Sequence, residues 1–504
     1  MVDSFPHPLP FSRREQTAAP ALARRAGLST LFALLGLVLS DASAAPAPTL
    51  PTLRVSTNQR FLVTAEGRPF FWLADTAWEI FHRLDRADAT AYLETRAQQG
   101  YNVIQAVALA EFDGLTQPNP YGDLPLLEND PTRPAITPGD DPAGATAYDY
   151  WDHVDFVVTE ANRRGMYVGL LPTWGDKWNK KWGTGPEVFT PANAAAYGEW
   201  IGRRYAGRAI IWILGGDRPV ENDRHREITH ALAQGLRRGD AGRHLITFHP
   251  SGSQSSSQWF HHEPWLDFNL QQTGHSPVPS APGQKTSWQR IAEDYGRTPV
   301  KPVIDGEPLY EDHPIGFRAA KELGYSFDAH VRQRAYWHVF SGACGHTYGN
   351  HTVWQMAAPG RKPVNGPLTY WPEALHRPGG TQMRFLRALI ESRPMLERVP
   401  DQSLVVDPLR GPDHLAATRG RDYAFIYSAQ GRSFTVNLGK ISGSEVTAWW
   451  FNPRNGAAEK IGTFANTGTR AFTPHPHGGF GTDLVLALDD AARNYPPPGV
   501  GLAP

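Results

Sequence analysis

Short apolar runs alternate with longer segments of helical periodicity from residue 53 to about residue 392. Consecutive apolar positions over so few residues are typical of strands buried on both faces. These predicted strands cover residues 70–75, 102–109, 166–171, 209–215, 245–249, 266–271, 302–306 and 346–348. Helices are predicted between and after them, at residues 86–99, 148–164, 191–205, 223–238, 287–295, 328–341 and 381–392. Eight strand–helix units within residues 53–395 predict an α/β fold, a (β/α)8 TIM barrel.

The pattern changes on both sides of the predicted barrel. Residues 396–493 contain short apolar runs separated by Gly, Asn and Asp turns, at residues 404–406, 414–418, 423–427, 433–438, 446–451 and 484–488. This spacing predicts a small antiparallel β-sandwich domain. Residues 494–504 are rich in Pro and Gly, and we expect a loose tail there. Ahead of the barrel, residues 54–57 and 61–64 predict a small hairpin.

The first 44 residues resemble an export signal. Arg24 and Arg25 precede an apolar run at residues 28–39, which ends near Ala42-Ser43-Ala44, an A-x-A cleavage pattern. Residues 1–44 are therefore predicted to be a signal peptide and residues 45–52 a linker, and the mature protein is expected in the periplasm or outside the cell. The run is short for a stable membrane span, although an uncleaved anchor is the alternative. Paired arginines leave both the general and the twin-arginine export routes open.

Composition narrows the range of functions. The 504 residues carry a net charge of -1, so no basic field is available to hold a nucleic acid. The single cysteine, Cys344, excludes an intrachain disulfide and a cysteine-based zinc site. Neither His261-His262-Glu263 nor the pair His346 and His351 has the spacing of a helical zinc motif, so we expect no metal. No dinucleotide fingerprint follows a strand and Ser251 lacks a nucleophile elbow, so no cofactor and no serine-hydrolase chemistry are expected.

Two predicted strands end in a glycine followed by a carboxylate. The apolar run at residues 209–214 leads into Gly215, Gly216 and Asp217, and the run at 302–304 leads into Asp305-Gly306-Glu307. Because the active site of a (β/α)8 barrel lies at the C-terminal ends of its strands, both acids should face one bowl. Glycoside hydrolysis needs two such carboxylates, an acid and a nucleophile or base. The alternative for each is a structural salt bridge or a helix cap.

Further strand-end residues could bind a sugar in the same bowl. His249 and Tyr348 could also hold the Glu307 carboxylate ionised, whereas burial and the second carboxylate should raise the pKa of Asp217. Ordinary core packing is the alternative for the tryptophans and for His249, and Asp75 could instead bond the backbone of its own turn. The candidate substrate-binding residues are Asp75, Trp78, Gln105, Trp174, His249, Gln271, His346, Tyr348 and Trp354.

An ordered set of motifs resembles the apiosidase-like glycoside hydrolases (family 140), and the match covers most of residues 53–490. After the barrel, Glu391-Ser392-Arg393-Pro394 opens a segment similar to a β-domain named for collagen binding. The barrel motifs are Phe71-Trp72-Leu73-Ala74-Asp75-Thr76-Ala77-Trp78, Gly100-Tyr101-Asn102-Val103-Ile104-Gln105, Trp212-Ile213-Leu214-Gly215-Gly216-Asp217, Asp305-Gly306-Glu307-Pro308 and Gly345-His346-Thr347-Tyr348-Gly349.

The resemblance implies a retaining glycosidase with Asp217 as acid/base and Glu307 as nucleophile. Its implied substrate is pectic rhamnogalacturonan II, from which apiose would be released. Gly216 stands where many relatives in the wider barrel clan carry an asparagine beside the acid. The alternatives are a retaining glycosidase of another sugar specificity and a non-catalytic carbohydrate- or collagen-binding protein. We expect an oligo- or polysaccharide partner, with the loops at 110–147 and 173–191 setting specificity, and the sequence leaves the oligomeric state open.

Overall fold

The computed structural model describes residues 50–144, 147–276, 283–316, 324–475 and 478–501. The predicted signal peptide and most of the predicted linker lie outside these residues. Within them, the helices are all too short or too polar to cross a membrane.

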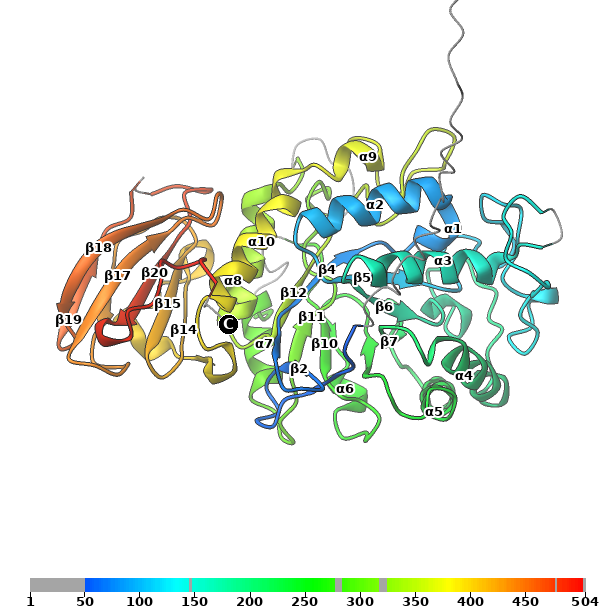
Figure 1. Cartoon of the computed structure of the whole chain (residues 1–504), viewed down its shortest axis with the longest axis horizontal. Helices are drawn as coiled ribbons and strands as arrows, with labels where there is room; N and C mark the ends of the chain where they lie inside the picture. Colours follow the sequence, from blue (N-terminus) through cyan, green and yellow to red (C-terminus); the bar gives the residue numbers. More distant parts are fainter. Residues whose placement is uncertain (1–49, 145–146, 277–282, 317–323, 476–477, 502–504) are drawn as a thin grey trace, which may run out of the picture. The chain divides into compact units, whose positions relative to one another are not determined.

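Six parallel strands form one ladder, a curled sheet in the order β12-β4-β5-β6-β7-β8 (Figure 1). Two more parallel strands, β10 and β11, form a second ladder, which the two-residue β9 joins in antiparallel fashion. The parallel strands coincide with the predicted apolar runs to within a few residues. Their bounds are β4 Trp72–Thr76, β5 Val103–Val107, β6 Tyr167–Leu171, β7 Ile210–Gly215, β8 Ile246–His249, β10 Asn269–Gln272, β11 Val303–Asp305 and β12 Gly345–Tyr348, with β9 at Gln254–Ser255.

The backbone pairing differs from the single eight-stranded ring that the sequence predicts. One backbone–backbone hydrogen bond, from Asp267 N–H to Ile246 O at 2.9 Å, links β8 to the residues before β10. Two bonds that involve side chains add to it, from Ile246 N–H to Asp267 Oδ2 at 2.6 Å and from Thr247 Oγ1 to Phe268 O at 2.7 Å. At the other junction, Cys344 N–H donates to Val303 O at 2.9 Å. The chain leaves β8 through β9 and a short helix before it reaches β10, and this detour separates the two ladders. The observed unit is therefore a curled parallel sheet in two ladders, with one backbone–backbone hydrogen bond at each of the two junctions between them.

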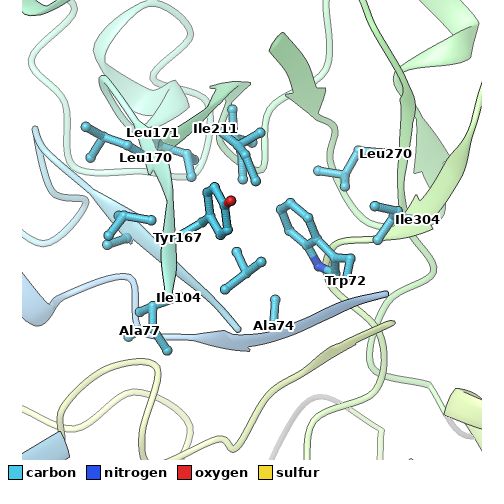
Figure 2. Packing of buried hydrophobic residues seen from close by; sticks show 14 of the residues in the cluster. Trp72, Ala74, Ala77, Ile104, Tyr167, Leu170, Leu171, Ile211, Leu270 and Ile304 are labelled. Atoms are coloured by element: carbon cyan, nitrogen blue, oxygen red, sulfur yellow. The ribbon is translucent and has the colours of Figure 1, made fainter. Parts of the chain in front are cut away.

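Side chains from both ladders meet in one apolar interior. Figure 2 shows Trp72 of β4, Tyr167 of β6, Ile211 of β7, and Leu270 and Ile304 of the second ladder directed into a common space. A Cβ at Gly169 would lie 2.9 Å from Ile213 Cδ1, so glycine at this position makes room for the Ile213 side chain. Burying a large aromatic ring such as that of Trp72 removes about 150–250 Å² of surface from water, which makes it a main contributor to the core.

Helices cover the parallel sheet, and their starts follow local capping chemistry. The side chains of Asp149 and Thr190 each form a reciprocal capping box at the start of α3 and α4. Helices α4 and α5 approach so closely that only glycine fits at two points of contact. A Cβ at Gly198 would lie 2.6 Å from a carbonyl oxygen of α5, and a Cβ at Gly235 would lie 2.4 Å from a carbonyl oxygen of α4. The helices are α1 Ile80–Arg83, α2 Arg86–Gln98, α3 Tyr150–Arg163, α4 Pro191–Tyr205, α5 Asp223–Gly239, α6 Ser257–Phe260, α7 Ser287–Tyr295, α8 Asp328–Phe340, α9 Trp371–Ala374 and α10 Pro378–Glu391.

A small sheet precedes the parallel strands, and short 3-10 turns occur along the whole chain. The predicted hairpin is present and gains a third strand, giving β1 Leu53–Val55, β2 Leu62–Thr64 and β3 Pro69–Phe70. The turns are η1 Leu127–Asn129, η2 Gly175–Lys177, η3 Met395–Glu397, η4 Gln402–Leu404, η5 Gly411–Asp413 and η6 Ala491–Arg493.

The C-terminal residues form an antiparallel β domain. Its six-stranded sheet runs β13-β14-β15-β20-β17-β18, and the β16-β19 pair shares an apolar cluster with it. The bounds are β13 Val399–Pro400, β14 Leu415–Arg419, β15 Tyr423–Ser428, β16 Phe434–Asn437, β17 Glu445–Phe451, β18 Ala458–Ala465, β19 Thr469–Phe472 and β20 Leu484–Asp490.

One sequence-based expectation for this region is wrong, and two strands were not predicted. Residues 404–406 are no strand: η4 ends at Leu404, and Val405 makes one isolated bridge to Val436. Strands β18 and β19 were missed because their side chains are mostly exposed and lack a clear apolar pattern. The loose tail stays a prediction; within its described part, Tyr495 OH donates to Asp422 Oδ1 at 2.9 Å.

Two buried ion pairs join the helices to the β domain. Arg332 of α8 donates to both oxygens of Asp483 at 3.1 and 2.8 Å. Arg393, which follows α10, donates to both oxygens of Asp489 at 2.7 Å. All four side chains are at most 4% exposed. Loss of Asp489 would leave the Arg393 charge buried without the anion of its pair, whereas Arg332 would keep a second ion pair with Asp328.

Candidate active site

The backbone at the end of β7 takes an unusual path. Gly215, Gly216 and Asp217 all have positive φ, at +89°, +102° and +53°. A Cβ at Gly215 would lie 2.2 Å from His249 O, and one at Gly216 would lie 2.7 Å from Gly175 N. Only glycine fits at these two positions. A non-glycine residue held in the left-handed region is strained, and strain of this kind concentrates at functional sites.

The Asp217 carboxyl is held through one of its two oxygens. Trp182 Nε1 and Arg218 Nη1 each donate to Oδ2 at 3.1 Å. The side chain keeps 24% of its surface exposed. Burial and the nearby charge of Glu307 raise the pKa of Asp217, more than Arg218 and His249 lower it. Because both donors occupy Oδ2, a proton on this carboxyl sits on Oδ1.

The Glu307 carboxyl follows β11 and meets two imidazole rings. His275 Nε2 lies 3.0 Å from Oε1 in hydrogen-bonding geometry. His249 Nε2 lies 3.0 Å from Oε2, out of line for a hydrogen bond. Burial alone would raise the pKa of Glu307, but the two imidazoles hold it well below its usual range. Glu307 is therefore a carboxylate at neutral pH, while the Asp217 carboxyl retains a proton to higher pH.

The backbone before Glu307 is fixed as tightly as that before Asp217. Asp305 Oδ1 accepts the Glu307 N–H at 3.2 Å, and Gln105 Nε2 donates to Gly306 O at 2.8 Å. A Cβ at Gly306 would lie 2.7 Å from Leu270 Cγ. Burial raises the pKa of Asp305 to about 6.

A single imidazole connects the two acids. Asp217 N–H donates to His249 Nδ1 at 3.3 Å, so the ring proton of a neutral His249 is on Nε2, facing Glu307. Trp78 and Trp174 hold this ring, with centroids 5.4 and 5.9 Å from it. Asp217 and Glu307 thus lie on either side of His249 and belong to one site.

His275 was not predicted from the sequence. Its Nδ1 lies 3.0 Å from Pro308 O and its Nε2 3.0 Å from Glu307 Oε1, so both ring nitrogens face acceptors. Both can donate only when the ring carries two protons. The signal in the sequence was Thr273-Gly274-His275, immediately after an apolar run, but Gln271 was taken as the end of that strand.

Comparisons with known proteins show to which family the chain belongs. Residues 56–397 match a family model described as "Apiosidase-like, catalytic domain". The chain belongs to the apiosidase-like family. Its catalytic domain is that of a glycoside hydrolase, and residues 399–489 match a second model, "Putative collagen-binding domain of a collagenase".

Two solved structures are similar to this apiosidase-like chain over most of its length. One, described as "Glycoside hydrolase", is 35% identical, with a TM-score of 0.79 and coverage of 88% of this chain and 98% of that one. The other is a glycoside hydrolase of family 5 from Bacteroides vulgatus ATCC 8482, also 35% identical, with a TM-score of 0.80 and coverage of 90% and 96%. The search of curated proteins returned no match.

Two of the predicted sugar-binding residues, Asp75 and Tyr348, are buried and bonded to other side chains. Asp75 is fully buried, and its Oδ2 accepts Tyr92 OH at 2.5 Å and Arg96 Nε at 2.6 Å. Tyr348 donates to Glu311 Oε2 at 2.6 Å rather than to Glu307. Both lie in a buried polar network whose members come from distant parts of the sequence, which is why the sequence did not reveal it.

Gln271 and His346 face the helices. Gln271 Nε2 donates to Asp294 Oδ2 at 2.6 Å on α7, and the His346 ring lies 5.7 Å from that of His338 on α8. Side chains alternate across a strand, so the neighbouring residues point to the interior. Gln272 is one of them, and its Oε1 is buried without a hydrogen-bond partner in the described structure.

The remaining candidates have little free surface, with one exception. Trp78 and Trp174 are 2% and 3% exposed and support His249. Trp354 is partly buried; its ring lies 5.5 Å from Phe112, and its Nε1 is 3.4 Å from His351 Nδ1. Trp354 stays a candidate for sugar contact. Among the residues that the structure describes, no group of three His, Cys, Asp or Glu side chains is arranged to hold a metal ion.

A cavity of about 700 Å³ is lined by residues close in sequence to groups that contact Asp217 or Arg218. Residues 112–113, 117–120, 360–364 and Thr184 contribute to its walls, together with His82 and Arg83. Glu111, next to Phe112 in the wall, lies 3.6 Å from Arg218 Nη2, and burial together with Asp217 raises its pKa to about 8. The wall carries the cationic side chains of Arg83, Arg361 and Lys362 and the carboxylate of Asp113.

Proposed function

We propose that this glycoside hydrolase cleaves its substrate with retention of configuration, with Asp217 as acid/base and Glu307 as nucleophile. The observation that carries the proposal is the opposite perturbation of two neighbouring carboxyls. The pKa of Asp217 is raised by burial and the charge of Glu307, while two imidazoles hold that of Glu307 low. An acid that keeps its proton beside a carboxylate that has lost one is the starting state of the double displacement.

The proposed reaction has two steps. In the first, Glu307 Oε2 attacks the anomeric carbon while the Asp217 Oδ1 proton passes to the glycosidic oxygen, so the leaving sugar departs as an alcohol. In the second, Asp217 takes a proton from water, whose oxygen attacks the anomeric carbon and releases Glu307. We assign attack to Oε2 because Oε1 accepts the His275 bond, whereas the His249 contact to Oε2 is out of line.

The proposed scaffold is a closed (β/α)8 barrel. The two ladders form its ring, and the backbone hydrogen bonds at the two junctions between them close it. In such a barrel the ends of β7 and β11 open at one face, where Asp217 and Glu307 act together. The contacts of both acids with His249 support this arrangement.

The proposed substrate is apiose-containing pectin of the rhamnogalacturonan II type, cleaved between apiose and galacturonic acid. The family description supports apiose as the released sugar. The cationic side chains in the cavity that Phe112 and Thr184 line suit a leaving group that carries a carboxylate. A retaining glycosidase with another sugar specificity is the second candidate, since no contact in the described site selects apiose by shape.

Product analysis tests this function. Purified protein is incubated with rhamnogalacturonan II fragments, with neutral hemicellulose oligosaccharides as the comparison. The expected product is free apiose, and proton spectra taken in the first minutes should show the anomer of the substrate. Release of the opposite anomer would exclude Glu307 as a nucleophile, and turnover of the neutral glycans alone would favour the second candidate.

We further propose that the protein is exported after cleavage of residues 1–44. Support comes from Arg24 and Arg25 ahead of an apolar run that ends in Ala42-Ser43-Ala44. N-terminal sequencing of protein secreted or released from the periplasm should begin near Ala45. A cytoplasmic chain that keeps Met1 would contradict the proposal.

A further inference from the structure

Trp182 is an exposed aromatic residue bonded directly to Asp217. It lies on the loop after β6, beyond η2, and 56% of its surface is exposed. Its Nε1 donates to Asp217 Oδ2 at 3.1 Å. Trp174 and Trp178, from the same loop, are at most 4% exposed and pack in the core. A tryptophan with this much free surface beside a reacting group therefore needs an explanation other than core packing.

A buried cation holds the indole in place. The Arg218 guanidinium lies 4.7 Å from the Trp182 centroid, and Arg218 is fully buried. Arg218 also donates to the main-chain oxygen of Asp217 at 2.8 Å and to Oδ2 at 3.1 Å. A Cβ at Gly183 would lie 2.4 Å from Arg218 Nη2, so the loop closes tightly over the guanidinium. The ring is thus fixed relative to Asp217 before any ligand binds.

We propose that Trp182 has two roles in the reaction, as a stacking platform for the leaving-group sugar and as the residue that orients the Asp217 carboxyl. This inference rests on the proposed function of Asp217 as acid/base. The acid/base must reach the glycosidic oxygen, so an exposed ring bonded to that carboxyl borders the sugar being expelled. The Trp182 bond to Oδ2 leaves Oδ1 to carry the proton toward this oxygen.

The course of the loop supports a leaving-group subsite here. Thr184, two residues after Trp182, lines the cavity of about 700 Å³. Phe112 also lines this cavity, and its neighbour Glu111 lies beside Arg218. The two chain segments that reach Asp217 and Arg218 therefore continue into the walls of the same cavity. A sugar stacked on Trp182 would have its next residue directed there.

The two roles can be separated by two variants. Trp182→Phe keeps a ring and removes the N–H, whereas Trp182→Ala removes both. Loss of the donor from the ionised Asp217 carboxylate raises its pKa, so the alkaline limb of kcat/KM should move to higher pH in both variants, by about half a unit or more. Only Trp182→Ala should raise KM for an oligosaccharide, by about tenfold. With the glycosyl fluoride of the released sugar, which has no leaving-group sugar, KM should not change.

Controls separate these effects from misfolding and from failure of the proposed function. Tyr370→Ala removes another exposed aromatic and should leave all parameters unchanged. The melting temperature of Trp182→Ala should stay within about 3 °C of the parent value, because the ring is mostly exposed. Full turnover by Glu307→Gln would contradict the proposed function, whatever the Trp182 variants do.

Two results would overturn the inference. One is an equal rise in KM for the oligosaccharide and the fluoride in Trp182→Ala, or no rise for either. The other is an alkaline limb that stays in place in Trp182→Phe. If the parent turns over no glycan, calorimetric titration with rhamnogalacturonan II fragments tests the stacking platform instead. Binding that is lost only in Trp182→Ala supports the platform. Equal binding by the parent and Trp182→Ala, or no binding by the parent, refutes it.

Discussion

The two strand ends that carry the acids share a backbone design but have opposite electrostatic surroundings. Each acid follows a glycine, Gly216 in one case and Gly306 in the other. A Cβ on either glycine would collide with neighbouring atoms. At Asp217 both donors bind one oxygen and the side chain is partly open to solvent. At Glu307 an imidazole lies within 3.0 Å of each oxygen. Similar strands thus place the acids, and the side chains around them shift their pKa values in opposite directions.

The largest expected effect is the loss of the nucleophile. Glu307→Gln keeps the shape of the side chain but cannot form a covalent intermediate, so kcat/KM should fall by about four orders of magnitude or more. Activity is measured on the glycan substrate, with Glu293→Gln on the exposed side of α7 as the control. A loss of less than about tenfold would mean that the two strand ends do not divide the roles in this way.

Removal of the acid/base should cost less, and the loss should depend on the leaving group. Asn tolerates the left-handed backbone at position 217, so Asp217→Asn should fold normally. We expect kcat/KM to fall by about 10² to 10⁴ for the oligosaccharide, but much less for the glycosyl fluoride, which needs no proton. Equal losses for both substrates would contradict an acid role for Asp217.

Breaking the imidazole clamp should alter the pH profile more than the maximal rate. His275→Gln or His249→Gln removes a contact that holds the pKa of Glu307 low, so this pKa rises and the acidic limb of kcat/KM moves to higher pH. The expected loss at the optimum is about tenfold to a hundredfold. His346→Gln, a buried histidine that faces α8, is the matched control, and its acidic limb should stay in place.

The smallest expected effect is on stability, where the two acids should have opposite signs. The folded pKa of Glu307 lies below its ordinary value of 4.5, so its ionisation stabilises the protein above that pH, and the gain is lost as pH falls toward the folded value. The folded pKa of Asp217 lies above its ordinary value of 3.8, so its ionisation costs stability as pH rises.

At pH 7, Asp217→Asn should therefore be more stable than the parent and Glu307→Gln less stable, each by about 1–2 kcal/mol. Urea unfolding at pH 7 and at pH 4 measures the difference in free energy of unfolding between the two variants. This difference should be smaller at pH 4. If both substitutions changed the free energy of unfolding at pH 7 in the same direction, the contrast between the two environments would be contradicted.

The sequence predicted the strands and the position of the two acids just after strand ends, because short apolar runs and Gly-acid pairs are local signals. It also predicted His249, which directly ends the apolar run of β8. It missed His275 and misplaced Gln271 because β10 ends one residue later than predicted, at Gln272, and side chains alternate between faces. The roles of Asp75 and Tyr348 depend on Arg96 and Glu311, and no local pattern identifies such distant partners.

The pairs that Arg332 and Arg393 form with Asp483 and Asp489 bear on how the chain can be divided. A chain cut after residue 397 would lose Asp483 and Asp489, which would leave Arg393 without the anion of its pair and Arg332 with Asp328 alone. It would also uncover Tyr336 and Phe340 of α8, which stack on Tyr427 and Phe425. The C-terminal strands are therefore not a detachable module. Calorimetry of the full chain should show one cooperative melting transition, and separate peaks would show instead that the halves unfold independently.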